Sequence, residues 1–231
     1  MENTNLIELS LYYKLKEFLS EKIELEEAVS EDQIVYSLQK NLIETNSAIE
    51  VFVNQELVET SEYTVNYMQG TITFHSPLVS SDLVTANYQA SKVHFYDINK
   101  EFITDQFNYP AICIYESKRK YEPIEFGTAR KSIIANWFID VWSDDVKQRN
   151  DISDQVITLL LEEDIDIVDY NVSLPIHADG TINPIFNPQN NILGNLLMNS
   201  INYEKKGSLD NETTTTYLTQ INTEFVVNIT N

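Results

Sequence analysis

The densest group of reactive side chains in the sequence is an acidic run. Residues 162–169 hold Glu162, Glu163, Asp164, Asp166 and Asp169. A strand would place Asp164 and Asp166 on one face, and hard cations such as Ca²⁺ bind carboxylate oxygens. A calcium loop also needs a glycine at its sixth position and a carboxylate at its twelfth, where this sequence has Asp169 and Pro175. The run therefore favours a solvated strand edge over a metal site.

Other patterns that support catalysis are missing from the sequence. His75, His94 and His177 are scattered without ligand spacing, so we interpret them as structural. No G-x-S-x-G elbow occurs, and the isolated glycines build neither G-x-G-x-x-G nor a P-loop. Cys113 lies in the apolar run 111–115 and is predicted to be a small buried side chain. We expect no catalytic residue, cofactor or metal, and keep a hydrolase or metal enzyme using the 162–169 carboxylates as an alternative.

Composition narrows the function classes further. The chain has 231 residues, with 15 Lys+Arg against 36 Asp+Glu and a net charge of −21. This charge argues against a general nucleic-acid binder and against docking on an anionic membrane. No apolar run is long enough to span a membrane, and no segment has the composition of a signal peptide. A single cysteine excludes an intramolecular disulfide. We expect a soluble protein kept in a reducing compartment.

The first part of the chain changes its hydrophobic period. Ile7, Leu11, Leu15 and Phe18 form a helical stripe, which predicts a helix from residue 5 to about 28. From residue 32 the period becomes two, with short β-branched and aromatic segments between turns. Met68-Gln69-Gly70 reads as a hairpin connection in which Gly70 takes a positive φ. Residues 32–90 therefore read as a small antiparallel β-module.

The next part predicts strands around one helix. The expected strands are Val93–Tyr96, Ala111–Glu116, Ile133–Trp142 and Ile165–Tyr170, and Ser143-Asp144 is expected to cap a helix that ends near Glu163. The basic cluster Lys118-Arg119-Lys120 is expected in a loop or in a salt-bridge surface between subunits. Residues 172–191 are rich in Pro, Asn and Asp and are predicted to form a long irregular loop.

The end of the chain has the clearest periodicity. Residues 213–229 alternate strictly, which predicts a strand much longer than the usual ~5–6 residues. Ile192–Lys206 is its expected hairpin partner, with the turn at Gly207-Ser208. A hairpin this long is expected to reach another subunit.

These elements predict an α+β fold with three parts. Residues 1–31 form an N-terminal helix that packs on the main domain, residues 32–90 form the inserted antiparallel β-module, and residues 91–231 form an α+β domain. The last part is expected to hold a mixed or antiparallel sheet flanked by a helix, with a long C-terminal β-hairpin.

The order of these features resembles a known family. The second half of the chain resembles tail terminator and related neck-ring proteins of tailed bacteriophages. The resemblance rests on five segments followed by two terminal strands: Pro110-Ala111-Ile112-Cys113-Ile114, Glu122–Gly127, Trp137–Trp142, Gln148–Ile152 and Asp169-Tyr170-Asn171. The β-module is similar to small β-domains of virion proteins through Val53-Asn54, Tyr63-Thr64-Val65 and Gly70–Phe74. The inserted module and the long Pro/Asn loop depart from the smallest terminators.

The resemblance implies a structural virion protein, assembled in the bacterial host cytoplasm. It implies a homo-hexameric ring at the phage neck or the head-proximal tail end, which terminates the tail and joins it to the head. Expected partners are further copies of the chain and other neck, tail-tube or sheath proteins, with DNA passing through the channel without specific binding and no membrane contact. The alternative is a baseplate or other virion attachment protein that binds a partner through the β-module.

The acidic charge has two interpretations in such a ring. A channel wall of like charge repels DNA and keeps it mobile, and the segments Glu21–Glu31 and Glu162–Asp169 are the candidates for wall or rim. Alternatively, these carboxylates only keep an outer surface soluble.

Overall fold

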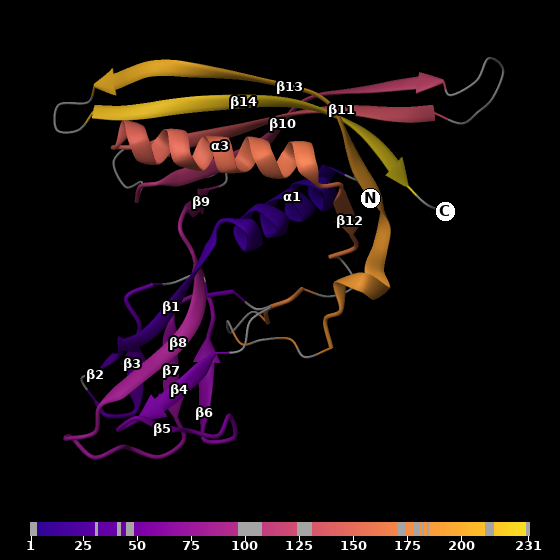
Figure 1. Ribbon diagram of the computed structural model, residues 1–231. Helices are drawn as coiled ribbons and strands as arrows, with labels where there is room; N and C mark the ends of the chain where they lie inside the picture. The colour runs from indigo at the N-terminus through magenta and orange to yellow at the C-terminus, as the bar shows by residue number, and fades with distance from the viewer. Residues whose placement is uncertain are drawn as a thin grey trace. The chain divides into compact units, whose positions relative to one another are not determined.

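The fold is α+β and forms two compact units (Figure 1). The first unit contains Met1–Leu19, Val93–Tyr170 and Pro188–Asn231, and the second contains Ser20–Lys92 and Asn171–Asn187. This computed structural model describes the chain except residues 1–3, 31, 41–42, 45–48, 97–107, 124–130, 171–173, 178–180, 182, 184, 211–214 and 230–231.

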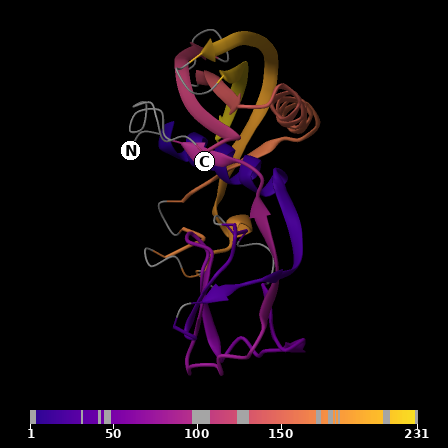
Figure 2. The same ribbon diagram turned by 90° about the vertical axis from the view of Figure 1, so that its left-hand side faces the viewer.

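In the described part of the chain, the first unit is a curved sheet with two α-helices. Its elements are α1 (Thr4–Phe18), β9 (His94–Tyr96), β10 (Ala111–Pro123), β11 (Lys131–Ser143), α3 (Val146–Glu162), β12 (Ile165–Val168), η1 (Pro188–Asn191), β13 (Ile192–Asp210) and β14 (Thr215–Ile229). Within the described residues, the strand order is β12-β13-β14-β11-β10-β9. Of the strand pairs described in this sheet, β9–β10 is parallel and the others are antiparallel. Figure 2 looks along α3 and shows the long strands curving beside it.

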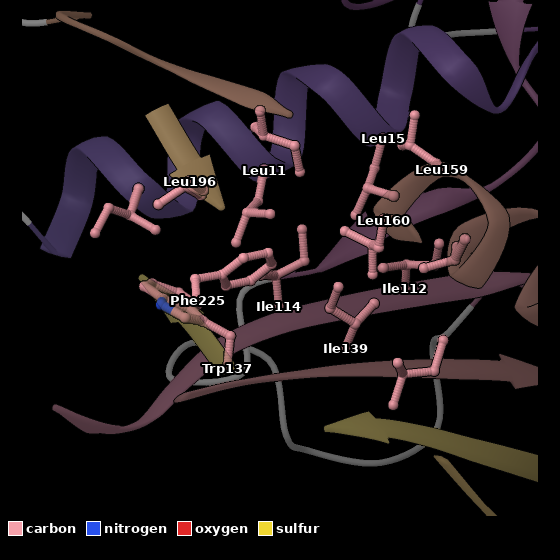
Figure 3. Packing of buried hydrophobic residues seen from close by; sticks show 14 of the residues in the cluster. Leu11, Leu15, Ile112, Ile114, Trp137, Ile139, Leu159, Leu160, Leu196 and Phe225 are labelled. Atoms are coloured by element: carbon pink, nitrogen blue, oxygen red, sulfur yellow. The ribbon is translucent and has the colours of Figure 1, made fainter. Parts of the chain in front are cut away.

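Both helices of this unit contribute to the core that covers one face of the sheet. Trp137, Ile139, Ile221 and Phe225 lie on that face because alternate residues of β11 and β14 point to the same side. Leucines of α1 and α3 pack against them (Figure 3). Burying each such side chain contributes about 1.5–3 kcal/mol, so this cluster positions the four long strands.

The first helix is shorter than the predicted 5–28. Leu19 continues the spacing of Ile7, Leu11 and Leu15 and is fully buried, whereas Phe18, predicted in the stripe, is 39% exposed. The next residues form β1, in which Ser20 pairs with Ser91 of the second unit. Prediction failed there because Glu, Lys and Leu favour helices locally, but pairing with a neighbouring strand overrides that preference.

A buried serine fixes α1 on the edge of the sheet. The Ser10 hydroxyl donates to the Leu6 carbonyl oxygen at 2.7 Å and accepts the Val168 backbone N–H at 3.1 Å. The rings of Tyr13 and Tyr170 stack with their centroids 4.7 Å apart, and Lys14 forms an ion pair with Glu163 at 2.6 Å. Residues far apart in the sequence thus hold the helix in place.

The second helix begins slightly later than predicted. Its N-cap is Asp145, whose carboxylate accepts the Gln148 N–H at 2.7 Å. Ser143 lies at the end of β11 and supports the cap, because its hydroxyl accepts the Asp145 N–H and donates to the Gln148 side chain. The end of α3 at Glu162 agrees with the predicted end near Glu163.

The second unit is built from two four-stranded sheets, counted over the described residues. Its strands are β1 (Ser20–Glu27), β2 (Val29–Ser30), β3 (Val35–Ser37), β4 (Glu50–Val53), β5 (Glu56–Leu57), β6 (Tyr63–Asn66), β7 (Thr71–Phe74) and β8 (Val84–Ser91). The sheet orders are β1-β8-β4-β5 and β2-β3-β7-β6. Side chains from both sheets form one core, with Val51 and Ala86 from the first and Ile72 and Phe74 from the second.

The turn at Gly70 follows the prediction. Gly70 has φ 67°, and its N–H donates to the Asn66 carbonyl oxygen at 2.9 Å. The Asn66 side chain also accepts the N–H groups of Met68 and Gln69. A non-glycine residue is disfavoured at this φ, so the sequence specifies this hairpin locally.

The predicted part boundaries differ from the observed units. The β-module begins at Ser20 rather than at residue 32, because β1 belongs to its first sheet. The irregular segment Asn171–Asn187, predicted within 91–231, groups with the β-module, where Ile176 packs against its core. Among the described residues, no helix is long and apolar enough to cross a membrane.

Candidate assembly interface

The long strands β10, β11, β14 and β13 form a ribbon, and parts of its two outer edges have no partner strand among the described residues. On one side, β12 pairs only with Ile192–Leu196 of β13, and in the described part of the chain nothing pairs with the outer side of residues 197–210. On the other side, β9 pairs only with Ala111–Cys113 of β10, so no described strand flanks residues 114–123. An unpaired strand edge presents backbone donors and acceptors that can pair with another chain.

The side chains near these edges are mostly exposed. On β13, Tyr203 is 58% exposed and its neighbour Glu204 is also exposed. On β10, Ser117 and Lys118 are exposed, and the Arg119 guanidinium forms an ion pair with Glu116 at 2.7 Å. Both edges therefore carry charged and aromatic groups at positions where a second strand would meet them.

A buried polar network lies on the sheet face opposite the helices. The Asp140 carboxylate is 4% exposed and accepts the Tyr115 hydroxyl at 3.2 Å and the Gln220 amide at 3.0 Å. The Gln220 amide also donates to the Tyr115 hydroxyl, and its oxygen accepts the Lys206 ammonium at 2.8 Å. These bonds link β10, β11, β14 and β13, so they fix the ribbon as one unit.

Burial controls the protonation of this network. Desolvation raises the pKa of Asp140, against the lowering effect of the Gln220 and Tyr115 hydrogen bonds and of the Lys206 charge. Desolvation, followed by the nearby Asp140 carboxylate, also raises the pKa of Tyr115. The hydrogen bonds of Asp140 and Tyr115 hold neighbouring strands together, which is a positioning role.

The predicted acidic run is not gathered into one site. Glu162 ends α3, Glu163 pairs with Lys14, and Asp164 precedes β12 instead of sharing a strand face with Asp166. Asp166 is exposed and pairs across the ladder with Asn195. Among the described residues, no three His, Cys, Asp or Glu side chains come together as a possible metal site.

The other candidate residues are also dispersed. His75 follows β7, His94 begins β9, and His177 lies in the irregular segment of the second unit. Cys113 is a free, buried cysteine in β10, as the apolar run predicts. Most of the predicted acidic segment Glu21–Glu31 lies in β1 and β2, while Glu31 falls outside the described residues.

The basic cluster lies in a strand rather than in a loop, and the predicted hairpin turn also lies within a strand. The other alternative for the cluster, a salt-bridge surface between subunits, stays a prediction. Lys118-Arg119-Lys120 lies inside β10, which continues to Pro123 because residues 118–123 pair with Lys131–Asn136. Gly207-Ser208 lies inside β13, where a register shift between Lys206 and Leu209 accommodates one extra residue. Pairing with β14 resumes at Leu209, so the strand runs beyond the turn that the glycine indicated.

Comparisons with known proteins do not assign the chain to a family. No protein-family model matches the chain, and no curated protein or solved structure is detectably similar to it.

Proposed function

We propose that the chain is a structural virion protein that forms a ring at the neck or the head-proximal tail end of a tailed bacteriophage. There it terminates the tail and joins it to the head. The family resemblance of the sequence motivates the site of action. The observation that supports a ring is the ribbon, whose edges on β10 and β13 lie at opposite sides of one sheet and have no partner strand in part of the described chain.

The physical argument concerns the type of contact that such edges allow. The two edges are different surfaces of the same chain, so pairing one with the other in a second copy is a head-to-tail contact. Head-to-tail contacts close into a ring when the rotation between subunits fits, and the resemblance implies a hexamer. The Asp140 network supports this role because it couples all four ribbon strands between the two edges.

The charge of the chain suits a passive channel. A ring of chains that each carry −21 repels duplex DNA, so DNA passes through without being held. In this proposal the protein is not an enzyme, its location is the virion, and its further partners are neck, tail-tube or sheath proteins. The purified ring is expected not to bind duplex DNA at physiological salt.

Location in the particle is the direct test. We would purify tailed phage particles whose genome encodes the chain, detect the chain by mass spectrometry, and locate it by immunogold electron microscopy. Label at the head–tail junction is the expected result. Label at the distal end would support the baseplate alternative, and absence of the chain from purified particles would refute both.

A further inference from the structure

We propose that neighbouring copies join by antiparallel pairing of β13 in one copy with β10 in the next, with Glu204 opposite Lys118. This inference rests on the proposed ring and names its contact. It begins from the two outer edges, which each offer an unpaired segment in the described part of the chain: residues 197–210 on β13 and 114–123 on β10.

Strand direction fixes the pairing as antiparallel. Successive neighbours β10, β11, β14 and β13 are all antiparallel, so β10 and β13 of one copy run in opposite directions. If the next copy continues the sheet in the same sense, its β10 lies antiparallel to β13 of the first copy. Antiparallel pairs are also the commoner kind.

The pleat limits the possible registers. Lys118 is in register with Asn136 and Glu224, and Glu204 is in register with Gln220 and Asp140. Both rows lie on the face opposite the helices, because the core residues of β11 and β14 alternate with them. A shift by one residue would place the two side chains on opposite faces, so only registers that differ by two are compatible.

Charge selects among these registers. With Lys118 opposite Glu204, the two charges attract, and Arg119 comes opposite the exposed ring of Tyr203. Moving the strands by two residues in one direction places Lys118 opposite Lys206, which repels it. Moving them in the other direction places Lys118 opposite Asn202, which has no charge. Opposite-charge cross-strand pairs stabilise a ladder and like-charge pairs weaken it.

Disulfide trapping tests the contact. We would make the double variant Lys118→Cys with Glu204→Cys and oxidise it mildly in solution and in assembled particles. Within one chain, β11 and β14 separate the two positions, which also lie in different rows of the ladder, so their Cα atoms are at least three strand spacings apart, or about 14 Å. A disulfide needs Cα atoms within about 7 Å, so any crosslink joins different copies. We expect a ladder of covalent oligomers.

The matched control is Lys118→Cys with Lys205→Cys, because Lys205 is adjacent to Glu204 but on the other face of the strand. This control should stay monomeric on denaturing gels. Equal or stronger crosslinking in the control, or monomers from both variants in both settings, would overturn the proposed register.

A charge swap provides a second readout. Lys118→Glu should weaken assembly, and adding Glu204→Lys should restore it because the two charges attract again. Failure of the swap to restore assembly would count against the pairing. Chains located at the neck without the Lys118–Glu204 crosslink would refute this contact and leave the proposed function standing. Crosslinked chains that are absent from particles would refute the function and leave the contact standing.

Discussion

Ser10 gives a direct measure of how α1 is held on the sheet. Its side chain is 3% exposed, and its hydroxyl accepts the Val168 N–H at 3.1 Å while donating to the Leu6 carbonyl oxygen. Ser10→Ala removes one oxygen and leaves almost no cavity. It also leaves the Val168 N–H without this acceptor in a buried position.

The expected loss follows from two opposing effects. An unsatisfied buried donor costs about 1–3 kcal/mol. Alanine has a higher helix propensity than serine, which returns roughly 0.5 kcal/mol. The free energy of unfolding should therefore fall by about 0.5–2.5 kcal/mol.

Ser153→Ala is the matched control. Ser153 is also buried in a helix, and its hydroxyl donates to the Arg149 carbonyl oxygen at 2.7 Å, four residues earlier, as Ser10 does to Leu6. No hydrogen bond to the Ser153 hydroxyl is found among the described residues. Replacing Ser153 by alanine removes a donor but leaves no backbone N–H without its acceptor. The free energy of unfolding should therefore change by no more than about 0.5 kcal/mol.

Tryptophan fluorescence during urea unfolding is the suitable assay. The sequence contains two tryptophans, Trp137 and Trp142, and both lie on β11 in the unit that carries both serines. The signal therefore reports this unit alone, and an unchanged dependence on urea shows that the variants remain comparable. If Ser10→Ala loses no more stability than Ser153→Ala, the Val168 hydrogen bond does not hold the helix.

Three further changes are predicted. Gly70→Ala should destabilise the second unit by about 1–2 kcal/mol, measured by circular dichroism in urea, because φ is 67° there. Burial raises the folded-state pKa of Asp140, so its stabilising contribution is full below the unfolded pKa of about 3.9 and is lost as pH rises through the folded pKa. Urea unfolding followed by tryptophan fluorescence should show that the free energy of unfolding of the wild type falls relative to that of Asp140→Asn as pH rises from the unfolded to the folded pKa. A difference between the two proteins that stays constant with pH would contradict this prediction. Backbone hydrogen bonds from Val35 and Ile34 lower the pKa of Asp32, so the stability difference from Asp32→Ala should shrink as pH falls below about 3.9, and a difference that persists at low pH would refute the assignment.

The sequence predicted elements wherever local signals and tertiary pairing agree. The alternation in β11 and β14 and the Gly70 turn needed no knowledge of distant partners. β1 was missed because its Glu and Lys residues favour a helix locally and become a strand only beside β8. The role of Ile176 was missed because nothing in a Pro- and Asn-rich segment indicates which core it joins.

The candidate interface was predictable only in part. Periodicity indicated a long hairpin, but the unpaired edges depend on where β9 and β12 stop pairing. Register is set by long-range partners, so a linear pattern leaves it open. The Asp140 network likewise joins residues from four strands, in which Asp140 lies 25 positions from Tyr115 and 80 positions from Gln220.

The discontinuity of both units constrains how the chain folds during synthesis. Ile176 packs against the core of the second unit, so this contact forms only after the whole of Val93–Tyr170, which belongs to the other unit, has been synthesised. The first helix also docks late, because the hydrogen bond between Ser10 and Val168 joins residues 158 positions apart in the sequence. Neither unit can mature from the N-terminus in order, and distant contacts slow folding. We expect the nascent chain to keep the apolar face of α1 exposed until late, which makes it a substrate for chaperones before it is a component of any assembly.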